Sequence, residues 1–167
     1  VLAGPIFNLL FAVLVFTLLW YIGFTIQTFD NKIIPASKYQ FEEHPTEYPA
    51  DKAGLQAGDR IVAINDKQVE HYQEIQEIVA QSAEETLRMT VERDGRQLHI
   101  TITPQMDKNT GVGKIGVYAW IEPVIGTVQS GSAADRAGLR QGDRLLSVDD
   151  QEIGNSMDLL QTLSDGP

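Results

Sequence analysis

The chain has 167 residues, no cysteine and a formal net charge of −10, from 23 acidic residues against 13 lysines and arginines. The lack of cysteine excludes a disulfide framework and a thiolate zinc site. The acidic surplus argues against nucleic acid and against anionic lipid headgroups as partners of the charged part. All of this charge lies beyond residue 29.

The N-terminal segment, residues 1–26, carries no charge and is longer than the roughly 20 apolar residues that a helix needs to cross a bilayer. It lacks the basic region and small-residue cleavage site of a signal peptide, so residues 1–27 are predicted to be a transmembrane helix in contact with membrane lipid. Because the chain begins with Val1, we expect a fragment of a longer protein that starts at a span. An amide in hydrocarbon needs a partner, so Asn8 is expected to face protein and not lipid.

An internal repeat organises the rest of the chain. "ADKAGLQAGDRIVAINDKQVEHYQEIQEIVA" (residues 50–80) returns as "ADRAGLRQGDRLLSVDDQEIGNSMDLLQTLS" (residues 134–164), in register and without a gap. A repeat at this domain-sized period predicts tandem domains, because solenoid repeats are shorter.

Each repeat predicts the same order of elements. A short helical turn ends at Gly54 and is followed by a strand, "RIVAIND", which closes in a turn. The segment "YQEIQEIVAQ" has apolar residues at helical spacing and predicts an amphipathic helix. Residues 87–102 alternate around the turn pair Asp94 and Gly95, which predicts a β-hairpin. The expected unit is therefore a small sheet capped by two helices.

The strings "AGLQAGDRIVAIND" and "AGLRQGDRLLSVDD" resemble the signature of bacterial PDZ domains. A span that opens with "GPIFN" and leads into two such domains resembles the site-2 protease family of intramembrane zinc metalloproteases, the type that has tandem PDZ domains. The predicted fold is a membrane α-helix followed by two α+β PDZ-like domains, each a small, partly open β-barrel or sandwich capped by two helices. The first domain is assigned to residues 28–107 and the second, C-terminally incomplete, to residues 108–167.

This resemblance implies a parent enzyme in the inner (cytoplasmic) membrane that spans it several times, with its PDZ domains extracytoplasmic or periplasmic. It implies zinc in the parent, and partners that are transmembrane proteins such as anti-sigma factors, or their exposed termini. Gly4, Pro5 and Asn8 match the family's span motif, which implies that Asn8 packs beside the zinc-bearing helix or the bound substrate.

The zinc chemistry of this family requires a "HExxH" helix and a third ligand, and this sequence contains neither. The isolated histidines, His44, His71 and His99, are predicted to be surface residues. The chain is therefore expected to hold no catalytic residue and no metal ligand, and to be inactive alone.

PDZ domains bind peptide ends beside a loop with the pattern hydrophobic, glycine, hydrophobic. Ile115, Gly116 and Val117 have this pattern and are assigned to the second domain, with Met157 and Leu160 as further groove contacts. No such loop occurs at the matching place in the first repeat, so the first domain is expected to act as a steric filter over the active site.

Two other classes of protein have similar parts. One is a non-enzymatic, membrane-anchored PDZ adaptor, and the other is a membrane-tethered serine protease of the HtrA type. The HtrA alternative is disfavoured because those proteins place PDZ domains after the catalytic domain and not directly after a span.

Overall fold

The computed structural model describes residues 3–23, 28–39 and 47–164. The first element is helix α1 (Ala3–Ile22), which confirms the predicted apolar helix. Its segment Gly4–Ile22, of mean hydropathy 2.1, is long and apolar enough to cross a membrane. The helix ends because Gly23 adopts a φ of 69° and its N–H closes the last turn on the carbonyl of Leu19 at 2.9 Å.

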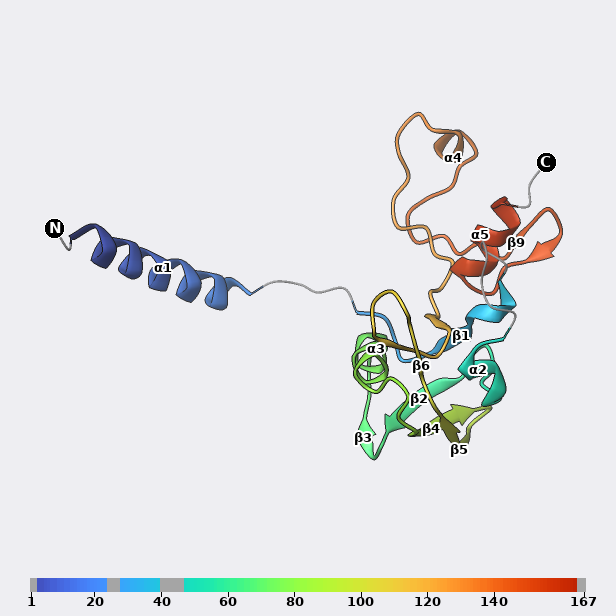
Figure 1. Ribbon diagram of the computed structural model, residues 1–167. Helices are drawn as coiled ribbons and strands as arrows, with labels where there is room; N and C mark the ends of the chain where they lie inside the picture. The colour runs from blue at the N-terminus through green and yellow to red at the C-terminus, as the bar shows by residue number, and fades with distance from the viewer. Residues whose placement is uncertain (1–2, 24–27, 40–46, 165–167) are drawn as a thin grey trace.

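The first repeat is built around a four-stranded antiparallel sheet, whose strand order is β3-β2-β4-β5 (Figure 1). Its elements, with those that flank it, are β1 (Ile33–Pro35), the 3₁₀ helix η1 (Ala36–Lys38), α2 (Pro49–Lys52), β2 (Arg60–Ile64), β3 (Lys67–Gln68), α3 (Tyr72–Gln81), β4 (Leu87–Arg93), β5 (Arg96–Ile102), β6 (Gln105–Met106), β7 (Gly113–Lys114) and β8 (Val117–Ala119). The predicted hairpin is confirmed: β4 and β5 pair along their whole length, and Asp94 and Gly95 both take the positive φ that a tight hairpin turn requires.

One hydrophobic core holds this repeat together. Helix α3 contributes Ile75 and Val79 to it, which confirms the predicted amphipathic helix, and α2 is followed by the buried Leu55. Five core residues of β2 and β4 are each less than 2% exposed: Ile61, Ile64, Leu87, Met89 and Val91. The alternation of residues along β4 therefore directs one face of the sheet to the core, as its sequence pattern predicts.

The first repeat also includes β8, a strand that follows the hairpin in sequence and pairs with β1 at the start of the repeat. Strand β8 pairs with β1 in antiparallel register, with Ile34 opposite Tyr118, and β7 pairs with β6. Ile115 lies in the same hydrophobic core as Ile33. The predicted boundary after residue 107 is therefore wrong, because it separates β8 from the strand with which it pairs.

Asp59, a residue of the repeated signature, is the main buried charge of the first repeat. It is 1% exposed, and both of its carboxylate oxygens accept hydrogen bonds of 2.7 Å from the guanidinium of Arg93. The N–H of Gln56 donates to the same carboxylate at 2.8 Å. This carboxylate raises the pKa of Arg93. The pair ties the turn before β2 to the end of β4.

The second repeat shows the same order of elements with fewer strands among the described residues. They are α4 (Ala133–Arg136), β9 (Ser147–Val148), β10 (Gln151–Glu152) and α5 (Ser156–Ser164). The turn of Asp149 and Asp150 has positive φ angles of 48° and 64°, close to the 48° and 67° of Asn65 and Asp66 in the first repeat. Leu146 and Leu163 are 69% and 64% exposed, so the apolar surface of this repeat is only partly covered.

A buried polar cluster joins the two repeats. The hydroxyl of Tyr39, which follows η1, donates to a carboxylate oxygen of Asp158 at 2.7 Å and lies 3.1 Å from the amide nitrogen of Asn155. Asn155 and Asp158 also cap the first turn of α5. Burial opposes the charge of Asp158, but hydrogen bonds from Tyr39 and Lys38 outweigh it and lower the pKa. The start of α5 is thus held by the segment that leaves β1.

Candidate peptide-binding groove

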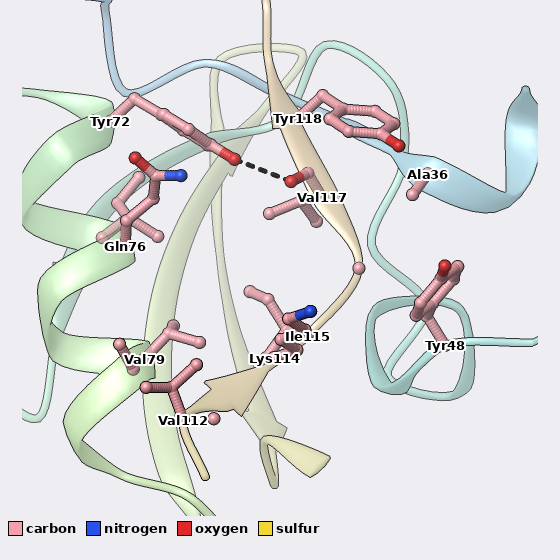
Figure 2. A pocket seen from close by; sticks show the side chains of 14 residues that line it. Ala36, Tyr48, Tyr72, Gln76, Val79, Val112, Lys114, Ile115, Val117 and Tyr118 are labelled. Carbon is pink, nitrogen blue, oxygen red and sulfur yellow. Dashed lines mark hydrogen bonds between the residues drawn. The ribbon is translucent and has the colours of Figure 1, made fainter. Parts of the chain in front are cut away.

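A groove of about 430 Å³ lies between helix α3 and the segment from Val112 to Tyr118 (Figure 2). The helix presents Ile75, Gln76 and Val79 to it, and the opposite wall is formed by Val112 and Ile115. Most of these side chains are apolar, so the groove suits an apolar side chain. Tyr72 and Gln76 add uncharged polar groups on the helix wall.

The loop between β7 and β8 has backbone donors that no described residue satisfies. None of the described residues accepts a hydrogen bond from the N–H of Ile115 or Gly116. The carbonyl of Gly116 accepts from the N–H of Ala36 at 2.8 Å, on the β1 side. Because successive residues of a strand direct their polar groups to opposite sides, the N–H and C=O of Val117 face away from β1, toward α3. Consecutive N–H groups in such a loop form a concave site for an anion.

Gly116 gives this loop its shape. Its φ of 79° is unfavourable for other residues, and a Cβ at this position would lie 2.1 Å from Cγ of Tyr48. The Tyr48 ring packs behind the strand, on the side away from α3 (Figure 2). Glycine is therefore required twice, for the backbone conformation and for the close approach of the ring.

The groove is closed at both ends by contacts between its walls. At one end the backbone of Gly113 lies so close to α3 that a Cβ would be 2.3 Å from the carbonyl oxygen of Val79. At the other end the Tyr72 hydroxyl donates a hydrogen bond of 2.7 Å to the carbonyl of Val117 (Figure 2). Tyr72 is 8% exposed, and its burial raises its pKa to about 12, so the hydroxyl keeps its proton at neutral pH.

Lys114 is the one charged residue among the described residues that line the groove. Lys114 forms an ion pair of 2.6 Å with Asp107, whose pKa is held well below its usual range by Lys114 and by hydrogen bonds from Thr110 and Asn109. This pair fixes the turn that leads into β7.

The sequence-predicted site residues are brought together only in part. Ile115, Gly116 and Val117 form the predicted loop, but they face α3 of the first repeat and not the second. The assignment of this loop to the second domain, and the statement that the first repeat has none, are therefore wrong. Met157 and Leu160 lie on α5 and do not line this groove. Gly4, Pro5 and Asn8 lie in the first two turns of α1.

The sequence interpretation missed Tyr72, Val79 and Gly113 as groove residues. It assigned the loop to the second repeat, because that repeat follows the loop directly in the chain. A signal was present, because the amphipathic helix 72–81 needs an apolar partner, and residues 112–119 are the first apolar segment after the hairpin.

His71 and His99 are both exposed, as predicted, whereas His44 lies outside the described residues. His71 occupies the N-cap of α3. Within the described ranges, no three His, Asp or Glu side chains are placed so that they could hold a metal ion. The described residues therefore do not fit a zinc site, and no step of a reaction is assigned to them.

The family model described as PDZ domain matches residues 46–93 and 124–166. The chain belongs to the PDZ domain family. The second matched segment begins after β8, which agrees with the closure of the first repeat by that strand.

Among the curated relatives, a putative zinc metalloprotease of Treponema pallidum is 37% identical over 98% of this chain and 36% of its own length. The zinc metalloprotease RasP of Geobacillus kaustophilus is 34% identical over 78% of the chain and 30% of its own length. The regulator of sigma-W protease RasP of Bacillus subtilis is 28% identical over 70% of the chain and 26% of its own length. The chain thus spans about a third of the relatives it matches, and the resemblance to site-2-type zinc metalloproteases is confirmed.

Proposed function

We propose that this chain is the PDZ-bearing part of a membrane-embedded zinc metalloprotease of the site-2 type, which performs regulated intramembrane proteolysis. The relatives named zinc metalloproteases and the apolar helix α1 support this proposal. The two repeats are two PDZ domains, and the parent's zinc is bound by residues other than those described here. Transmembrane proteins are the substrates, and anti-sigma factors suit the name of the Bacillus subtilis relative.

The groove between α3 and β8 binds the free C-terminus of a substrate. The observation that carries this proposal is the row of consecutive N–H groups at Ile115 and Gly116, from which no described residue accepts and which belong to residues that line an apolar groove. A terminal carboxylate accepts from the row, the last side chain enters the pocket beside Val79, and the peptide adds as a strand to the edge of β8. Since the loop lies in the first repeat, capture of a peptide end is favoured there over a purely steric filter.

A peptide titration tests this proposal. We expect a hexapeptide of alanines ending in valine to bind with its free carboxylate and to lose about 10- to 100-fold in affinity as the C-terminal amide, because charge-assisted hydrogen bonds are lost. Isothermal titration calorimetry on the chain in detergent micelles measures both peptides. Equal affinity for the acid and the amide would contradict carboxylate recognition, and no binding of either would reject the groove as a peptide site.

The substitution Gly116→Ala tests the loop itself. It should abolish binding of the free-acid peptide, because the new Cβ collides with Tyr48 and the positive φ is strained. Gly111→Ala is the matched control, since Gly111 has a φ of 74° but nothing within 4 Å of the added Cβ. Retained binding in Gly116→Ala, or equal loss in both variants, would show that the loop geometry is not what recognises the peptide.

We place the PDZ domains outside the cytoplasm, on the basis of the family resemblance and without support from charge asymmetry around α1. A reporter that is active only in the cytoplasm, fused after Ser164 in the parent protein, is therefore expected to be silent. A periplasm-active reporter at the same position is the control and should be active. Strong cytoplasmic activity would contradict this topology and would favour a membrane-anchored adaptor of reversed orientation.

A further inference from the structure

The loop at residues 115–117 is tied to the segment that follows β1. The N–H of Ala36 donates a hydrogen bond of 2.8 Å to the carbonyl of Gly116. Ala36 is 3% exposed, begins the 3₁₀ helix η1 and lines the groove. The N–H of Tyr39 closes η1 on the carbonyl of Ala36 at 3.0 Å. The position of the loop therefore depends on where η1 and Tyr39 are held.

Tyr39 is held by the second repeat. Its hydroxyl donates to the carboxylate of Asp158 at 2.7 Å and accepts from the amide nitrogen of Asn155 at 3.1 Å. Asn155 directly precedes α5, and Asp158 lies in its first turn. Tyr39 and Asn155 are both buried, and hydrogen bonds in such surroundings are stronger than in water. Lys38, also in η1, adds an ion pair of 3.1 Å with Asp158.

The strand on the other side of the loop contacts the start of α5 as well. From Gly116 to Trp120 the chain advances by about 13 Å at about 3.3 Å per residue. The ring of Trp120 lies close to Gly154, where an added Cβ would be 3.9 Å from it. The N–H of Ser156, the first residue of α5, donates to the carbonyl of Ile121 at 2.8 Å. The start of α5 is thus held by the segments that continue from both β1 and β8.

We propose that the contact of Tyr39 with Asn155 and Asp158 is a conformational clamp, through which the second repeat regulates peptide capture by the first. The closed clamp holds η1, and with it the Gly116 carbonyl, in the arrangement that binds the peptide. A partner of the second repeat that displaces the start of α5 weakens binding in the first groove. This inference rests on the proposed peptide-binding function of that groove. Because coupling between two sites is reciprocal, a bound peptide must also stabilise the clamp.

The variant Tyr39→Phe tests the clamp. It keeps the buried ring and removes the hydroxyl that donates to Asp158, and Tyr39 is not among the residues that line the groove. We expect the variant to bind the alanine hexapeptide ending in valine about three- to tenfold more weakly than the wild type, the worth of one net hydrogen bond.

Thr162→Val is the matched control for this variant. It also removes one hydroxyl donor, but the Thr162 hydroxyl donates to the carbonyl of Asp158 at 2.9 Å and to the side chain of Gln151 at 3.1 Å, both within the second repeat. We expect the control to bind the hexapeptide as tightly as the wild type does. Thermal unfolding followed by circular dichroism shows whether both variants are folded.

Amide hydrogen exchange in the wild type measures the reciprocal effect and does not depend on the stability of a variant. The N–H of Ser156 exchanges when its bond to the Ile121 carbonyl opens. Saturation with the hexapeptide should slow this exchange by about three- to tenfold, and by less in Tyr39→Phe. The N–H of Ile153, bonded to the Leu146 carbonyl at 2.9 Å, is the reference, because a general stabilisation by the ligand would slow both amides.

Each outcome decides between the proposals. Weaker binding by Tyr39→Phe together with selective slowing at Ser156 supports the clamp. Equal hexapeptide affinity in Tyr39→Phe and the wild type, an equal loss in Thr162→Val, or no selective slowing at Ser156 overturns the clamp and leaves the peptide groove standing. If the wild type does not bind the hexapeptide, the proposed peptide-binding function fails and the clamp fails with it.

Discussion

Asp59→Ala should lower the free energy of unfolding of the first repeat by about 3 kcal/mol or more, because it leaves the Arg93 guanidinium without the carboxylate that it faces. The loss is large since Asp59 is 1% exposed and holds Arg93 through two hydrogen bonds of 2.7 Å. The N–H of Gln56 loses its acceptor as well. Urea unfolding of the chain in micelles, followed by far-ultraviolet circular dichroism at neutral pH, measures the change.

Asp66→Asn is the control for this prediction, because Asp66 has a φ of 67° that asparagine tolerates and alanine does not. Asp66 also forms an ion pair with an arginine, Arg88, at 2.9 Å, but both side chains are highly exposed, 88% for Asp66 and 72% for Arg88. Exposed ion pairs contribute little to stability, so this variant should unfold at nearly the wild-type urea concentration. A loss of similar size in both variants would show that burial is not the reason for the strength of the Asp59 pair.

The same aspartate shows what a sequence repeat can and cannot predict. Asp59 and Asp143 occupy matching positions, and each accepts a hydrogen bond of 2.8 Å from the N–H three residues earlier. That local role is predictable, because it depends on the spacing within the turn. The pairing with Arg93 was not predictable, since it joins residues that only the folded sheet brings together.

The elements of the first repeat followed from local patterns, whereas their grouping into a domain did not. Apolar periodicity predicted α3, and the pair Asp94 and Gly95 predicted the hairpin, because both signals are contained within a few residues. The pairing of β1 with β8 joins Ile33 to Ala119 across the whole first repeat. Nothing local to "KIGVYAWIEP" indicates whether it closes the preceding repeat or opens the next one.

This grouping determines the function that is assigned to each repeat. Once β8 belongs to the first repeat, the loop at residues 115–117 faces Ile75 and Val79 on α3, and the first repeat has both walls of a peptide groove. The exposed Leu146 and Leu163 show that the second repeat, within the described residues, lacks an equivalent apolar partner. The proposed ligand site therefore belongs to the first repeat.

Hydrogen bonds connect the groove to α5 through the polar cluster between the repeats. The carbonyl of Gly116 accepts a hydrogen bond of 2.8 Å from the N–H of Ala36. Three residues after Ala36, the Tyr39 hydroxyl donates a hydrogen bond of 2.7 Å to the carboxylate of Asp158. Tyr39 is 1% exposed and Asn155 is fully buried, so this contact excludes water. Buried and satisfied hydrogen-bond networks of this kind favour one relative arrangement of the elements that they join.

Asn8→Leu in the full-length parent should give a well-expressed, membrane-inserted protein whose cleavage rate is reduced on the order of 100-fold, the cost of small misplacements of reacting groups. Asn8 lies exposed on α1, and no described residue forms a hydrogen bond with its side chain. An amide in hydrocarbon needs a partner, so we expect that partner to be another part of the parent's helix bundle.

Cleavage per molecule of inserted protein, compared between Asn8→Leu, Asn8→Ala and a Leu9→Ala control, decides whether Asn8 faces the bundle or lipid. Leu9 is 65% exposed on the neighbouring position of α1 and tests for a general effect of altering the helix. Interhelical polar contacts in membranes average only about 0.6 kcal/mol, so both Asn8 variants should insert normally. If Asn8 faces lipid, leucine suits that surface better than asparagine, and Asn8→Leu would retain or improve activity. If Asn8 positions the active site, both variants lose cleavage while Leu9→Ala keeps it, and the difference between insertion and turnover assigns the effect to chemistry and not to stability.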